Sequence, residues 1–214
     1  MESVARKLYE GDFEVMDDER YYTIRGRQFD RTVKYTIDDL YALPEDWRVE
    51  LIDGVFYDMA SPSIKHQRIL RNLSFTIENF IRSKGGKCEM FFAPCGVKLH
   101  ADNDRTFVEP DILVVCDPNK IKDRWCVGAP DWIIEVVSPG NPGHDYVRKL
   151  RKYTETGVRE YWIVDPRNEA VTVYIRTDGK YIDKSYKFTD TIKAGIYDDL
   201  FIDFNEISAD PYNL

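Results

Sequence analysis

The chain has 214 residues, of which 43% are hydrophobic, enough for one domain of slightly above average size with a sizeable core. Its formal net charge of −8 argues against a surface that binds nucleic acid through positive charge alone. No apolar stretch approaches the ~18 residues of a membrane span, and the start lacks the apolar segment of a signal peptide, so we expect a cytoplasmic protein with no membrane attachment.

Four cysteines are present, and none belongs to a CxxC pair; they are Cys88, Cys95, Cys116 and Cys126. This spacing disfavours a zinc site. In a cytoplasmic protein it predicts reduced, buried thiols.

The first third of the chain holds an extension, a short helix and a hairpin. Residues 1–33 are polar with mixed charge, which predicts an N-terminal extension, partly helical and partly mobile, ahead of one domain at 34–214. Residues 35–44 predict a short helix, because Thr36 is a suitable N-cap with an acid three residues later. The stretch "RVELIDGVFYDMA" predicts a β-hairpin around an Asp-Gly turn.

Two longer amphipathic helices are predicted, at 62–84 and 144–157, from the helical spacing of their apolar residues. Between and after them, strand-forming runs end at Gly, Pro or Asp-Gly turns. The expected order is αββαββββαβββ. It indicates an α/β or α+β fold with a mixed sheet flanked by helices.

Two of the predicted strands, at about 109–116 and 131–137, carry acidic side chains in apolar surroundings. Alternation places Asp111 on the face of Leu113, and Glu135 on the face of Ile133. A buried carboxylate needs a cation, a proton or hydrogen bonds, and two carboxylates on adjacent strands suit Mg²⁺. Alternatively, these acids lie at strand ends and pair with Arg or Lys.

Four segments resemble one known family: "YTIDDLYALPEDWRVELIDG", "VEPDILVV", "PDWIIEVVSPGN" and "DYVRKLRKYTETGVREYWIVDP". They are similar to the Uma family of restriction endonucleases, which belongs to the PD-(D/E)XK nuclease superfamily. The resemblance runs from about Tyr35 to beyond Asp165. It implies a restriction-endonuclease-like core with a Mg²⁺ site, for which Mn²⁺ can substitute, on the central strands.

The resemblance also implies roles for single residues. Asp111 matches the Asp of the "PD" motif, and Glu135 matches the second acid; both are expected to bind metal and to be catalytic. Glu50 matches the additional metal-binding acid that an upstream element contributes. His66 stands where a His is common in the family, as a further partner of the site. Alternatively, it is a hydrogen-bonded core histidine.

The sequence departs from the superfamily pattern after the second acid. The expected Lys is replaced by Val137, and we expect Lys149 on the following helix to replace it as a catalytic residue. Alternatively, Lys149 is a solvated lysine paired with Asp145, four residues earlier. The neighbouring Arg148, Arg151 and Lys152 are candidates for contacts with the DNA backbone, or form an ordinary solvated helix face.

These inferences favour a Mg²⁺-dependent DNA endonuclease that hydrolyses phosphodiesters with a metal-activated water, with DNA as partner and a homodimer as the expected assembly. Two alternatives stay open. The chain could be a nuclease-fold binding or scaffold protein without turnover, or a metal-dependent phosphoesterase acting on RNA or nucleotides.

Overall fold

A six-stranded mixed sheet forms the centre of the computed structural model, which describes residues 20–138 and 142–209. Only β10 and β11 are parallel neighbours; the other pairs are antiparallel. In spatial order the strands are β13 (Lys180–Lys187), β12 (Ala170–Thr177), β11 (Glu160–Asp165), β10 (Trp132–Val136), β8 (Ile112–Val115) and β5 (Glu89–Phe92). The predicted mixed sheet flanked by helices is confirmed.

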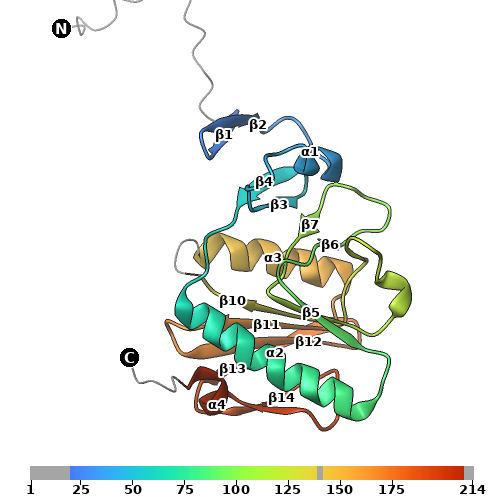
Figure 1. The fold of residues 1–214 in the computed structure, drawn as a ribbon, viewed down its shortest axis with the longest axis vertical. Helices are drawn as coiled ribbons and strands as arrows, with labels where there is room; N and C mark the ends of the chain where they lie inside the picture. Colours follow the sequence, from blue (N-terminus) through green and yellow to red (C-terminus); the bar gives the residue numbers. More distant parts are fainter. Residues whose placement is uncertain (1–19, 139–141, 210–214) are drawn as a thin grey trace, which may run out of the picture.

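A five-stranded sheet lies beside it (Figure 1). In spatial order its strands are β4 (Val55–Asp58), β3 (Val49–Ile52), β7 (Phe107–Val108), β6 (Val97–Lys98) and β9 (Cys126–Val127). The hairpin β3–β4 turns at Asp53 and Gly54 with φ of 53° and 76°, so the Asp-Gly turn predicted here is confirmed. Two small antiparallel pairs complete the strands: β1 (Tyr21–Ile24) with β2 (Arg27–Asp30), and β14 (Thr191–Lys193) with β15 (Phe201–Asp203).

The α-helices in the described part of the chain are α1 (Ile37–Tyr41), α2 (Ile64–Lys84), α3 (Pro142–Thr156) and α4 (Phe204–Ser208). A short 3₁₀ helix, η2, spans Pro118–Lys120. The N-cap of α1 is Thr36 with a complete capping box, as predicted. The helix α2 begins after Ser63 and ends at Gly85, which adopts φ of 59°, where glycine avoids the strain of a side chain.

Strand alternation divides the core of the large sheet into two faces. Ile112, Ile134 and their even-numbered neighbours pack with the apolar stripe of α2. Leu113 and Ile133 pack on the opposite face with Tyr153 of α3 and with residues of the five-stranded sheet. Helix α2 therefore covers one face of the large sheet, while α3 and the smaller sheet cover the other (Figure 1).

The described part of the predicted N-terminal extension has a different structure from the one expected. Residues 21–30 form the hairpin β1–β2 rather than a helix. Ile24 and Phe29 of this hairpin are buried with Phe56 and Leu51, because strand-forming residues flank a turn at Arg25 and Gly26 that has positive φ. Residues 1–19 lie outside the described residues, and the division at 33/34 stays a prediction.

The expectation of four reduced thiols is wrong for one pair. Cys88 and Cys116 form a disulfide, because the strand pairing of β5 with β8 brings the two residues together. Cys95 and Cys126 are free. Within the described residues, no helix is both long and apolar enough to cross a bilayer.

Candidate active site

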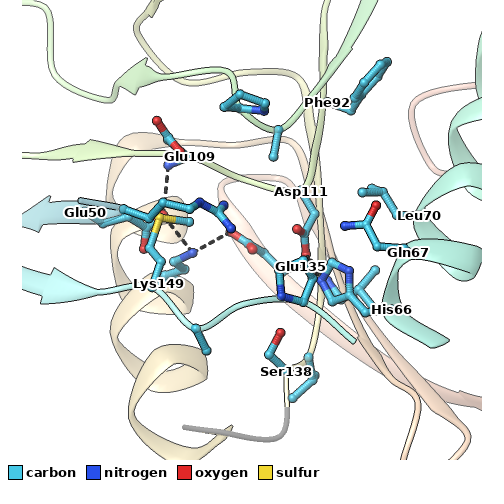
Figure 2. A pocket seen from close by; sticks show the side chains of 18 of the residues that line it. Glu50, His66, Gln67, Leu70, Phe92, Glu109, Asp111, Glu135, Ser138 and Lys149 are labelled. Carbon is cyan, nitrogen blue, oxygen red and sulfur yellow. Dashed lines mark hydrogen bonds and ion pairs between the residues drawn. The ribbon is translucent and has the colours of Figure 1, made fainter. Parts of the chain in front are cut away.

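A cavity of about 790 Å³ opens where the two sheets, α2 and α3 meet (Figure 2). One end of it is acidic, with Glu50 of β3, Glu109, Asp111 and Glu135 of β10. Lys149 of α3 lies among these acids. The structure thus brings Glu50 and Lys149, which are 99 positions apart in the chain, to one cavity.

Asp111 and Glu135 are cross-strand neighbours. The antiparallel register ends with Ile112 opposite Ile134; Asp111 directly precedes Ile112 and Glu135 directly follows Ile134, so continuing this register sets the two acids opposite each other. Side chains in such a pair lie on the same face, with Cβ atoms roughly 4.5–5.5 Å apart. The two acids predicted as metal ligands are therefore adjacent.

Asp111 is held in place by two hydrogen bonds. Its Oδ2 accepts from the backbone N–H of Val136 at 2.7 Å, and it lies 3.1 Å from Nε2 of His66. The His66 side chain is 4% exposed and comes from the first turn of α2. His66 therefore contacts Asp111, rather than Glu50, at the edge of the site.

Lys149 bridges two of the acids. Its Nζ lies 2.9 Å from Oε1 of Glu50 and 3.1 Å from Oε1 of Glu135, and the lysine side chain is 8% exposed. Glu50 Oε1 also accepts from the backbone N–H of Glu109 at 2.8 Å. Lys149 is therefore buried and not a solvated lysine; its predicted pairing with Asp145 lies outside the described residues and stays a prediction.

Tyr153 is a site residue that the sequence did not identify. Its hydroxyl donates to Oε1 of Glu135 at 2.8 Å, one helical turn after Lys149. The signal that could have found it is the i, i+4 spacing on α3, which places both side chains on one helix face.

Burial and like charge raise the pKa values of Glu135 and Glu109. Burial is the main reason that the pKa of Glu135 rises to about 8; Lys149 opposes this rise, while Asp111 and Glu50 add to it. Burial, followed by the charge of Glu50, also raises the pKa of Glu109. Four acids crowded around one buried lysine thus leave an excess of negative charge that favours a proton or a cation.

The carboxylate oxygens of this cluster suit a hard cation, but fewer acids are available as ligands than the three that the sequence predicted. Among the described residues, no group of three or more His, Cys, Asp and Glu side chains is arranged to hold a metal. Asp111 and Glu135 remain as an adjacent carboxylate pair, and one or two protein carboxylates are usual for Mg²⁺. In Glu50, Oε1 is occupied by Lys149 and by the Glu109 amide.

The basic residues of α3 are mostly engaged within the protein. Lys152 is buried and pairs with Asp53 at 2.7 Å and Glu155 at 2.9 Å. Arg151 pairs with the same two acids but is 65% exposed. Arg148 stacks over the ring of Tyr57 at 3.8 Å. Of the three residues predicted to contact DNA, Lys152 is the least able to leave its partners.

Comparisons with known proteins agree on a family. The model of the Uma2 family, described as "Putative restriction endonuclease", matches residues 37–200. An uncharacterized protein of Synechocystis, slr1290, is 27% identical over 146 residues, which are 67% of this chain and 75% of that protein. A crystal structure of "a putative nuclease belonging to DUF820" from Anabaena variabilis covers 81% of this chain and 97% of its own, with a TM-score of 0.65 and 19% identity. At that identity, the likeness shows the fold.

Proposed function

The chain belongs to the Uma2 family, and from this premise we propose that it is a Mg²⁺-dependent endonuclease that hydrolyses phosphodiester bonds of DNA. The observation that carries the proposal is the juxtaposition of Asp111, Glu135 and Lys149 at one end of a cavity. Asp111 and Glu135 supply two adjacent acidic ligands. Lys149 supplies the buried ammonium group that the superfamily pattern expects at position 137, where this chain has Val137.

In this proposal, Asp111 and Glu135 hold the cation, with Mn²⁺ as a substitute for Mg²⁺. A divalent ion held there would supply an activated water and would neutralise charge on the phosphate. Glu50 either completes the ligands through Oε2 or acts only on Lys149, since its Oε1 is already occupied.

The protein's own groups position the reacting atoms. The Nε2–Oδ2 contact of His66 and the amide of Val136 fix the rotamer of Asp111. Glu50 and Glu135 hold the Lys149 ammonium in place before substrate binds. A preorganised ammonium in a water-poor site stabilises negative charge that develops on the phosphate. The hydroxyl of Tyr153 fixes Glu135 from the other side.

A nuclease fold without turnover is the main alternative. The absence of a lysine at Val137 supported it, but the structure places Lys149 beside Glu135, which favours the enzyme. The third possibility, action on RNA or nucleotides, has no observation in its favour.

A cleavage assay with labelled DNA, in Mg²⁺, Mn²⁺ or EDTA, tests the proposal. We expect the metal ions to support cleavage, and Asp111→Asn to abolish both cleavage and the binding of Mn²⁺ measured by calorimetry. The matched control is Asp183→Asn, which changes an exposed aspartate of β13. Cleavage that survives in EDTA, or in Asp111→Asn, would refute the assigned chemistry. Mn²⁺ binding without cleavage of DNA or RNA would favour the scaffold.

Two further expectations remain predictions. The homodimer rests on the family resemblance, and gel filtration tests it. The cytoplasmic location is part of the proposal, although the Cys88–Cys116 disulfide is unusual for that compartment. Counting thiols in protein purified under oxygen-free conditions tests whether the pair is oxidised in the cell.

A further inference from the structure

The cavity extends far beyond its acidic end. His66, Gln67, Leu70, Arg71 and Ser74 all line it. Of these, Gln67, Leu70, Arg71 and Ser74 follow the i, i+3, i+4, i+7 spacing of one face of α2, and His66 directly precedes Gln67. With a rise of 1.5 Å per residue, the nine residues from His66 to Ser74 span about 12 Å. The acids therefore occupy one end of an elongated pocket, and the rest has no role in the hydrolysis proposed above.

The distal part of the pocket is an apolar slot. Phe92, at the end of β5, is 57% exposed and lines the cavity together with Pro94. Figure 2 shows Phe92 on one side, and Gln67 and Leu70 of α2 on the other side, of the space next to Asp111. An exposed aromatic ring and the apolar Leu70 on one cavity, with an amide and a guanidinium group on the same lining, suit a flat ring that carries polar edges.

Two buried polar atoms on this face of α2 have no protein partner. They are Nδ1 of His66 and Oγ of Ser74, and both residues line the cavity. His66 is 4% exposed, so its ring is removed from bulk water. An unsatisfied buried polar atom is destabilising unless something bonds to it. Both atoms are therefore candidates for a hydrogen bond with a ligand that enters the pocket.

We propose that this distal part is a base-binding subsite, and that the substrate is single-stranded DNA, or an unpaired stretch of DNA, lying along α2 with the scissile phosphate at Asp111 and Glu135. The proposal rests on the nuclease function above and adds the substrate class. Phe92 stacks on one unpaired base. Gln67 and Ser74 bond to its edge, and Arg71 contacts the neighbouring phosphate.

The burial of the acidic end favours an unpaired strand over a duplex. The side chains of Lys149, Glu135 and Asp111 are only 8%, 13% and 17% exposed. A phosphate must enter the cavity to reach them. The bases of a duplex are paired and stacked inward, and Phe92 can stack on a base only when that base is free or flipped.

The overall charge points the same way. Proteins that grip duplex DNA through many phosphate contacts depend on large basic surfaces. This chain has a formal net charge of −8, and the basic residues of α3 that are described are largely paired. Proteins that bind single strands also use positive charge, but stacking on aromatic rings adds affinity that does not come from charge, and an acidic protein can draw on it.

Fluorescence anisotropy with the full-length protein in EDTA tests the subsite without cleavage. The probes are a labelled 12-nucleotide DNA strand, the same strand in a blunt duplex, and an RNA strand of equal sequence. We expect the single DNA strand to bind at least tenfold more tightly than the duplex. Phe92→Ala should weaken that binding roughly 5- to 100-fold, the range for loss of one base stack, and Phe92→Tyr should restore it.

The matched control is Phe201→Ala, because Phe201 is 59% exposed and lies outside the cavity; its affinity for the strand should equal that of the parent. Equal binding of duplex and strand, equal effects of Phe92→Ala and Phe201→Ala, or a preference for RNA would overturn the proposal.

Cleavage assays distinguish a failure of the base-binding subsite from a failure of the nuclease proposal. Metal-dependent cutting of blunt duplex, insensitive to Phe92→Ala, would remove only the subsite. Strand binding that depends on Phe92, without any cleavage, would remove only the nuclease.

Discussion

Two buried glutamates on neighbouring strands of the large sheet have opposite surroundings. Glu160 of β11 is 0% exposed, and it accepts hydrogen bonds from Trp162 Nε1, Gly195 N and Ile196 N at 2.6, 2.9 and 2.8 Å. Glu135 of β10 is bound by Lys149 and Tyr153 through Oε1 alone and lines a cavity.

The difference separates a structural acid from a candidate functional one. Of the donors to Glu160, Trp162 lies in the core, whereas the N–H groups of Gly195 and Ile196 belong to a loop that these bonds tie to the sheet. Glu135 keeps Oε2 without a described partner, beside Asp111 and a buried lysine. Burial raises the pKa of both, so the raised pKa does not distinguish them. Glu135 differs from Glu160 in that only its Oε1 has described partners, so its Oε2 is left to bind a ligand.

The substitution Glu135→Gln should have the largest effect, and the quantity that it changes is the rate of DNA cleavage. We expect a fall of roughly three orders of magnitude or more, because the variant loses a proposed metal ligand and the electrostatic contact with Lys149. Cleavage of labelled DNA in Mg²⁺ measures it. Glu89→Gln, which changes an exposed glutamate on β5 of the same sheet, serves as control and should keep full activity. Full activity of Glu135→Gln would place this acid with Glu160 as a structural residue.

Next in size is Lys149→Met, which keeps the aliphatic stem but deletes the charge. Cleavage should fall by roughly two to four orders of magnitude, the effect of losing one transition-state contact and the preorganised ammonium, while calorimetry should show that Mn²⁺ still binds. Lys152→Met is the comparison, because it also removes a buried, doubly paired lysine of α3. Equal losses in the two variants would mean that Lys149 acts through stability alone, or that Lys152 contacts DNA as the sequence suggested.

Glu160→Gln should change stability instead of activity. The amide –NH₂ cannot accept a hydrogen bond, so at least one N–H of the 195–196 loop loses its acceptor on the buried side chain, at a cost of roughly 1–3 kcal/mol. Urea unfolding measures the change. The protein that remains folded should cleave DNA at the parental rate, in contrast to Glu135→Gln. Parental stability of Glu160→Gln would show that these three bonds are not needed.

The smallest effect concerns pH in the absence of metal. The pKa of Glu135 is about 8 in the folded protein and ordinary, near 4.3, when unfolded. The folded state therefore holds a proton that the unfolded chain has released, and stability falls as pH rises from about 4 to 8. Glu135→Gln lacks this group, so in EDTA its stability relative to that of the parent should rise between pH 5 and pH 8. Parallel stability curves for the two proteins would contradict the raised pKa.

Local sequence signals determined much of the architecture. The capping box at Thr36, the Asp-Gly turns and the apolar stripe of α2 depend on residues within a few positions of one another, and each is where the sequence predicted it. Alternation along β8 and β10 likewise placed Leu113 and Ile133 on one face. The motifs were also sufficient to predict the family, which the comparison confirmed.

Contacts between distant segments were decided only by the folded structure. Residues 21–30 form strands whose apolar side chains pack on β4, a contact that no local pattern specifies. Cys88 meets Cys116 only when β5 pairs with β8. At the site, the sequence indicated Asp111, Glu135 and Lys149, but it could not show that Lys149 Nζ lies between Glu50 and Glu135. Nor could it show that a slot lined by Phe92 continues from the acids. The reason is physical: spacing along a strand or helix fixes which face a side chain occupies, whereas the packing of whole elements fixes what that face meets.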